Sequence, residues 1–188
     1  DHPITAKATD PTGNVSDASA PQTITIDTTA PTITSINVVS SNTASNRAKK
    51  DDIITFKVGF SEAVTLSNKD NVKVPFTIGG TSKTAVAQLN NTSTIGGTVN
   101  AIEFKYTVEA LDPALTGVVA LEGSNLILSN NATVKDNATN NLNPSFATLT
   151  LADGVTVDNT SPTATLGYNP TGPYKENDTV TITATFNE

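Results

Sequence analysis

The side chains that could do chemistry in this 188-residue sequence are almost all oxygen donors. There is no Cys, which excludes thiolate metal sites and thiol nucleophiles. The single imidazole, His2, cannot build a Ser/His/Asp triad or a multi-histidine metal centre within one chain. The sequence keeps 18 Asp and Glu residues, together with many Asn and Thr. Two kinds of carboxylate chemistry remain open: acid–base hydrolysis and the binding of a hard cation such as Ca²⁺.

Hydrolysis is the less favoured of these two. A glycosidase needs a pair of carboxyls about 5 to 9.5 Å apart across a cleft, whereas Asp27, Glu62 and Asp136 stand at the ends of predicted strands or in turns. Trp is absent and the three Tyr are scattered, so the sequence offers no aromatic platform for a sugar. We therefore expect no enzyme activity and no catalytic residue.

Alternation of apolar and polar residues predicts the elements that position these acids. Ile54, Phe56, Val58 and Phe60 alternate with polar residues, and residues 180–186 repeat the pattern. Further strands are expected at 32–39, 72–78, 84–89, 101–108, 125–134 and 146–157, separated by Gly, Pro and Asn turns. About seven short strands predict an all-β sandwich of antiparallel sheets with Phe56, Phe60, Phe104 and Val108 in its core.

Three motifs occur twice, in the same order. TITIDTTAPT at 23–32 is echoed by GVTVDNTSPT at 154–163, with Asp27 and Asp158 131 residues apart. The motif from Asp52 to Glu62 is echoed from Asp178 to Glu188, and ATDPTGN at 8–14 by VKDNATN at 134–140, both 126 residues later. The sequence therefore predicts repeats: 1–27 as the last two strands of one unit, 28–158 as a complete unit, and 159–188 as the first two strands of the next.

The segments IDTTAPTIT, DDIITFKVGFSEAV, EFKYTV and ATDPTGNVS resemble the immunoglobulin-like repeats of large bacterial surface adhesins and surface-layer proteins. The resemblance spans the whole chain. Thr139 and Asp51 depart from it, because the family usually has Gly at both places. The resemblance implies an immunoglobulin-like antiparallel β-sandwich in a tandem array, a structural role, frequent loading with calcium and an extracellular location.

That fold predicts where the acids meet. In an immunoglobulin-like sandwich the entering linker, the loop after the second strand and the loop before the last strand share one pole. Asp27, Glu62 and Asp136 should converge there, with an amide oxygen from Asn140 and a carbonyl from Thr28 or Thr29, and such an all-oxygen set suits Ca²⁺. The matching candidates are Asp158 and Glu188 at the next junction, and Asp10 and Asn14 at the preceding one. The same residues can also form plain Asx turns that end strands, and the sequence leaves both interpretations open.

Charge and hydropathy limit the partners. With 11 basic against 18 acidic residues the formal charge is −7, which argues against nucleic acid, and no apolar run is long enough to insert in a membrane. No signal peptide is present, so we expect the sequence to be a segment of a longer protein.

We expect a non-enzymatic extracellular repeat of a cell-surface stalk, filament or layer, made rigid by Ca²⁺ at its linkers. Its partners would be neighbouring repeats, or identical subunits bound head to tail. The alternative is a ligand-binding adhesin module that recognises a glycan or protein through the polar segments 66–71 and 90–100.

Overall fold

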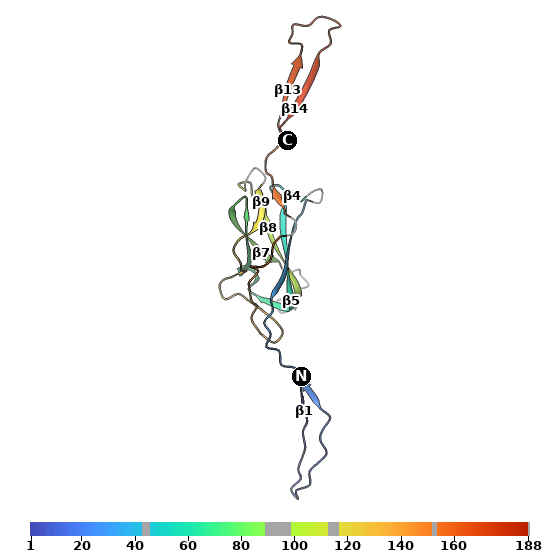
Figure 1. The fold of residues 1–188 in the computed structure, drawn as a ribbon, viewed down its shortest axis with the longest axis vertical. Helices are drawn as coiled ribbons and strands as arrows, with labels where there is room; N and C mark the ends of the chain where they lie inside the picture. The colour runs from blue at the N-terminus through green and yellow to red at the C-terminus, as the bar shows by residue number, and fades with distance from the viewer. Residues whose placement is uncertain (43–45, 89–98, 113–116, 152–153, 188) are drawn as a thin grey trace.

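The computed structural model describes residues 1–42, 46–88, 99–112, 117–151 and 154–187. Within these ranges the chain is all-β, with one short 3-10 helix, η1 (Lys69–Asn71). A central sandwich lies between two hairpins that point away from it in opposite directions, so the molecule is a long rod (Figure 1). None of the helical structure in the described ranges could cross a membrane.

The central sandwich is one hydrogen-bonded sheet that folds over on itself. Its strands are β3 (Ile33–Ser40), β4 (Arg47–Ala48), β5 (Ile53–Ser67), β6 (Val72–Ile78), β7 (Thr81–Gln88), β8 (Val99–Thr107), β9 (Gly117–Leu121), β10 (Ile127–Leu128), β11 (Thr133–Lys135) and β12 (Thr156–Val157). Their order is β11-β5-β8-β7-β6-β9-β12-β4, with β3 added on β5 and β10 on β6. The pairs are antiparallel except β12 with β4, which is parallel.

The two layers meet across an apolar core. Strands β5 and β6 are not neighbours in the sheet, yet the rings of Phe56 and Phe76 lie with centroids 4.8 Å apart, so the two strands face each other. Burial alternates along both strands, as expected where one face is in the core. The predicted core residues Phe56, Phe60, Phe104 and Val108 are all buried, which confirms the assignment of the strand faces.

Several predicted strands differ from the observed ones. In the described part of the predicted strand at 146–157, only Thr156–Val157 forms a strand, while β9 at Gly117–Leu121 was not predicted. The predicted strand at 125–134 is broken into β10 and β11, because Asn130 and Asn131 take left-handed φ values of 49° and 58°. Residues 66–71 are not a long loop, since β5 continues to Ser67 and η1 follows.

The error at 146–157 has a clear cause. Phe146 and Val155 are both buried, so the apolar pattern there does report burial. The described backbone between them, at 147–151 and 154, forms no strand, however, and begins with a turn in which the Leu149 N–H donates to the Phe146 carbonyl at 2.9 Å. Apolar side chains reach the core from a loop as well as from a strand.

The two hairpins are simpler. At one end β1 (His2–Ile4) pairs with β2 (Gln22–Ile24), and at the other β13 (Ala164–Asn169) pairs with β14 (Thr181–Phe186). Every residue of these four strands is exposed. The hairpins therefore share no core with the central sandwich.

Candidate metal centre

Three acids from distant parts of the sequence meet where the N-terminal hairpin joins the sandwich. Asp27 lies in the linker before β3, Glu62 lies in β5, and Asp136 directly follows β11. Each offers a carboxylate oxygen, and these oxygens all lie within 4.8 Å of one another. Two oxygens bound to the same Ca²⁺ at about 2.3 to 2.6 Å can be at most about 5 Å apart. The spacing therefore fits a shared cation.

Backbone pairing explains why the acids meet. The Thr32 N–H donates to Ser61 Oγ and the Ser61 N–H donates to the Thr32 carbonyl, both at 2.9 Å, which holds the linker beside β5. On the other side, β11 pairs with the end of β5 through Lys135 and Thr65. The residues that follow Ser61 and Lys135 are Glu62 and Asp136, so both carboxylates are brought to the linker.

Asn140 fastens the linker to Asp136. Its backbone N–H donates to Asp136 Oδ1 and its Nδ2 donates to Asp136 Oδ2, both at 2.8 Å. The same Nδ2 donates to the carbonyls of Asp27 and Thr29 at 3.2 Å. We expected the amide oxygen of Asn140 to face the acids, but the structure turns its nitrogen toward them. Asn140 therefore positions the linker, and the ligand atoms come from the carboxylates.

The turn that carries Asp136 has a copy in the N-terminal hairpin. There the Asn14 N–H donates to Asp10 Oδ1 and Asn14 Nδ2 donates to Asp10 Oδ2, both at 2.8 Å, as in the Asp136 turn. The hydrogen bonds from Asn14, followed by those from Thr12, lower the pKa of Asp10 to about 2. Asp10 and Asn14 are exposed and lie apart from the three converging acids, in an Asx turn.

Thr139 and Asp51, the two positions where the sequence departs from the glycine of the resemblance, both have a left-handed backbone. Thr139 has φ 71°, in the left-handed region occupied by Gly13 (φ 94°) in the copied turn, and Asp51 has φ 72°. The turns form, but Thr139 holds a β-branched side chain in a conformation that favours glycine.

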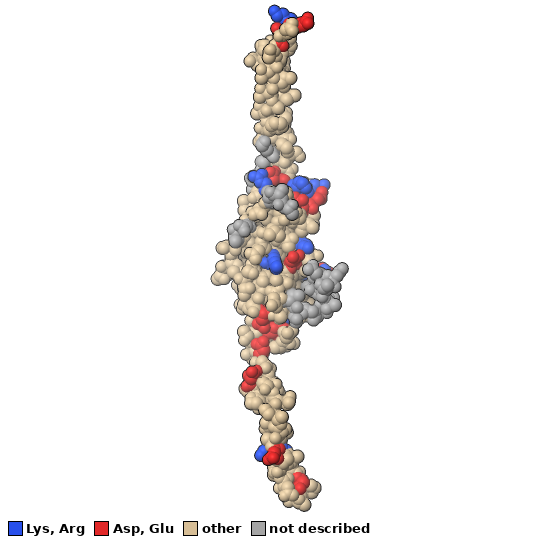
Figure 2. Space-filling view, turned by 90° about the vertical axis from the view of Figure 1, so that its right-hand side faces the viewer, with Lys and Arg blue, Asp and Glu red and all other residues tan. Residues whose placement is uncertain are grey.

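The negative charges of the three acids lie close together, and the acids differ in burial. Asp136 is only 4% exposed, Glu62 is half-buried and Asp27 is exposed. Burial raises the pKa of Glu62 above its ordinary value, and the negative charges of Asp27 and Asp136 raise it further. In the part of the chain that the structure describes, no ion pair involves any of the three. Acidic side chains also gather at this junction on the surface (Figure 2).

The C-terminal junction repeats only part of this arrangement. Asp158 Oδ1 accepts the Thr160 N–H at 3.0 Å, as Asp27 Oδ1 accepts the Thr29 N–H at 2.9 Å. The other oxygen of Asp158 lies 3.9 Å from Arg47, a weak ion pair. Glu188 lies outside the described residues. The structure therefore brings together Asp27, Glu62, Asp136 and Asn140, and it leaves Asp158, Asp10 and Asn14 in separate turns.

A second polar cluster was not predicted from the sequence. The side chain of Asp112 is fully buried, and its oxygens lie 2.6 Å from Lys83 Nζ and 2.9 Å from the Tyr106 hydroxyl. The backbone N–H of Glu109 also donates to Asp112, at 2.7 Å. The contact with Asp112, followed by that with Tyr106, raises the pKa of Lys83, while burial raises the pKa of Tyr106 to about 12. Lys83 and Asp112 form no short motif, so the sequence gives no signal for this cluster.

Asn159 connects this cluster to the linker that leaves the sandwich. Its Nδ2 donates to the carbonyls of Glu109 and Asp112 at 3.1 and 3.2 Å, and its Oδ1 accepts the Lys50 N–H at 2.6 Å. Asn159 therefore holds the exit linker as Asn140 holds the entry linker. An open pocket of about 380 Å³ lies beside Lys83 and Tyr106.

Of the segments expected to contact a ligand in the alternative function, residues 90–98 lie outside the described ranges. Residues 68–71 are tied to the turn at 129–130 by amide hydrogen bonds such as Asn130 Nδ2 to Asn71 Oδ1 at 2.9 Å.

Comparisons with protein families, with characterised proteins and with solved structures gave no match. The functional argument therefore depends on the geometry of the chain itself.

Proposed function

We propose that this chain is a structural link of an extracellular surface protein, built from immunoglobulin-like tandem units and made rigid by Ca²⁺ at the junction between units. The observation that carries the proposal is the convergence of Asp27, Glu62 and Asp136 at the linker, with carboxylate oxygens within 4.8 Å of one another. The rod-like shape, with a hairpin at each end of the sandwich, supports a spacer role (Figure 1).

The donor set favours Ca²⁺ over other metals. It contains only oxygen, whereas zinc and copper sites in proteins draw on sulfur or imidazole. Asp27, Glu62 and Asp136 would hold the cation, which would neutralise carboxylates that repel one another.

A shared cation would also stiffen the molecule. Asp27 belongs to the linker, while Glu62 and Asp136 belong to the sandwich, so a cation bound to all three would connect the two. The Asn140 hydrogen bonds already hold the linker backbone close to this place. Cation binding would restrict the remaining movement of the hairpin against the sandwich.

Thermal unfolding of the full chain tests the proposal. A cation that binds only the folded state stabilises it by about 2.7 kcal/mol at a concentration 100 times its Kd. We expect Ca²⁺ to raise the melting temperature relative to chelator, and Asp136→Asn to remove this increase. Asp17→Asn makes the same Asp-to-Asn replacement at an exposed position of the N-terminal hairpin and serves as the matched control.

Glu62→Gln gives a sharper test, because its effect on the melting temperature should be opposite in chelator and in Ca²⁺. In chelator it should raise the melting temperature, since it removes one of three repelling charges. In Ca²⁺ it should reduce the stabilisation, since it removes a ligand. Small-angle X-ray scattering should show a narrower spread of hairpin orientations when Ca²⁺ is present. A melting temperature identical in chelator and in millimolar Ca²⁺ would refute the proposal.

A further inference from the structure

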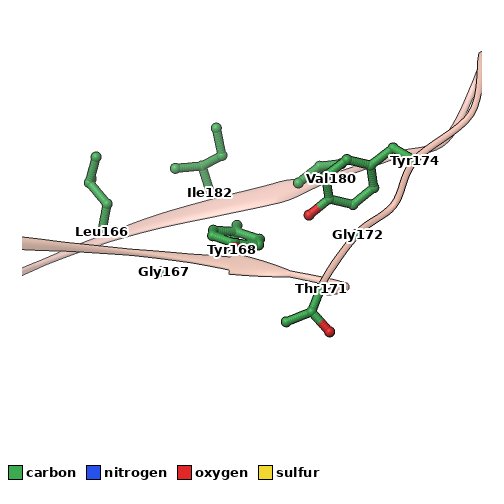
Figure 3. Close-up of a pocket in the computed structure, with 8 residues that line it drawn as sticks. All are labelled: Leu166, Gly167, Tyr168, Thr171, Gly172, Tyr174, Val180 and Ile182. Carbon is green, nitrogen blue, oxygen red and sulfur yellow. The ribbon is translucent and has the colours of Figure 1, made fainter.

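The C-terminal hairpin carries an apolar face with no core beneath it. Leu166, Tyr168, Ile182 and Phe186 are between 60 and 71% exposed. Leu166, Tyr168 and Ile182 project to the same side of the hairpin, while Thr171 points to the other side (Figure 3). They line a hollow of about 530 Å³ together with Val180 and Tyr174. The charged residues of 159–187 are confined to the tip, at Lys175, Glu176 and Asp178.

The hairpin has the strand register of β3 and β5 in the central sandwich. Leu166 pairs with Ala184 and Tyr168 with Ile182, as Ile36 pairs with Val58 and Val38 with Phe56. Relative to β5, each partner on β14 is 126 positions further along the chain, which is the spacing of two of the three repeated sequence motifs.

Both ends of the hairpin repeat the bonds of the sandwich. The Thr163 N–H donates to Asn187 Oδ1 at 2.6 Å, in the place of Thr32 and Ser61. Ahead of the second strand, the Lys175 N–H donates to Asp178 Oδ2 at 2.9 Å, as the Lys49 N–H does to Asp52 Oδ2 at 2.9 Å. The hairpin therefore has the local structure of β3 and β5.

One pair on this face has the same residue types as a core pair of the sandwich. In the sandwich the central pair is Val38 and Phe56, with the aromatic ring on the second strand. In the hairpin the pair is Tyr168 and Ile182, with the ring on the first strand. The aromatic residue is on the second strand in the sandwich and on the first strand in the hairpin, but each pair has one β-branched and one aromatic residue. Opposed changes of this kind keep the volume of a packed layer nearly constant.

In the sandwich this face is covered by the opposite layer. Ile36, Val38, Phe56 and Val58 are at most 6% exposed, and the ring of Phe56 packs on Phe76 of β6. We propose that the apolar face of β13 and β14 is the docking surface for one kind of partner: the apolar sheet of a further unit of this repeat, equivalent to β6 and β7. The inference rests on the tandem-unit part of the proposed function, and it does not depend on calcium.

The test adds such a layer to the 188-residue chain. A copy of residues 63–158 is fused after Glu188, so that β14 continues as β5 does. We expect amide hydrogen exchange in β13 and β14 to slow at least about 100-fold, because the hairpin becomes part of a cooperative core. The slowing should persist in chelator, whereas the proposed calcium function is judged by the melting temperature alone.

Two variants make the result specific. Ile182→Asp should abolish the slowing in the fused chain and leave the melting of the 188-residue chain unchanged, because Ile182 is 71% exposed there. Thr183→Lys, which copies Lys57 on the outward face of β5, should leave the slowing intact. A control fusion replaces residues 159–188 by a copy of residues 28–62, followed by the same copy of 63–158. It tests whether the added layer folds when its partner is the native β3 and β5.

Two outcomes would overturn the inference. The first is a hairpin that stays unprotected while the control fusion folds. The second is protection that already appears in the 188-residue chain and grows with its concentration, because the face would then be occupied by a second copy of the hairpin.

Discussion

Replacement of Lys83 by Met tests the buried charge cluster of the sandwich. The change removes the charge but keeps an unbranched side chain. The Asp112 side chain, with no exposed surface, then loses the ammonium group that lies 2.6 Å away. Breaking a buried pair by removing one partner costs about 3 to 5 kcal/mol. The Tyr106 hydroxyl and the Glu109 N–H still donate to Asp112, so we expect the lower end, about 3 kcal/mol.

The assay is thermal and denaturant unfolding at neutral pH. For a unit of this size, about 3 kcal/mol corresponds to a fall of about 10 °C in melting temperature. Lys57→Met removes an exposed lysine from β5 and should cost less than about 0.5 kcal/mol.

A double variant separates charge from packing. Adding Asp112→Asn to Lys83→Met removes the unpaired charge while keeping an acceptor for Tyr106, so the double variant should be more stable than Lys83→Met alone. If Lys83→Met costs under 1 kcal/mol, or if the double variant is the less stable of the two, the cluster is not a buried charge pair.

Three further results are expected. Thr139→Gly should stabilise the sandwich by about 1 kcal/mol. It relieves about 1 to 2 kcal/mol of strain from the left-handed backbone, and the added entropy of the unfolded chain costs less than that. Denaturant unfolding that shows no gain in stability would contradict this. The free energy of unfolding should fall as pH rises from about 10 to 12, because the folded state holds the protons of Tyr106, with its pKa of about 12, and of Lys83 more tightly than the unfolded chain does; a flat profile across this range would argue against it. Phe60→Ala should cost about 3 to 5 kcal/mol in the same melts, since Phe60 is only 7% exposed.

The sequence predicted burial better than it predicted backbone pairing. The alternation from Ile54 to Phe60 assigned the inward face of β5 correctly, because a strand with one face in a core has a period of two. The same reasoning failed at Phe146 and Val155, which are buried on irregular backbone. It also missed β9, which is only five residues long. A pattern of apolar side chains indicates which residues are buried, but it does not indicate which strand their backbone pairs with.

The candidate site was predictable to a similar degree. The motif spacing and the expected topology bring Asp27, Glu62 and Asp136 to one pole, and the structure has them within reach of one another. The donor role of Asn140 was not predictable, because the orientation of an amide depends on the carbonyls around it. Lys83 and Asp112 were missed for a related reason: each looks like an ordinary surface charge until the fold buries the carboxylate.

The entry and exit of the sandwich each include a parallel pairing, Thr32 with Asn143 at one pole and β12 with β4 at the other. When the two ends of the chain, which lie at the bases of the two hairpins (Figure 1), are pulled apart, the force acts along these contacts. Strands pulled along their length slide in shear, so the hydrogen bonds that join them must break together, whereas strands peeled from an edge open one bond at a time. Under load the sandwich should therefore yield abruptly, after the hairpins at its ends have already opened.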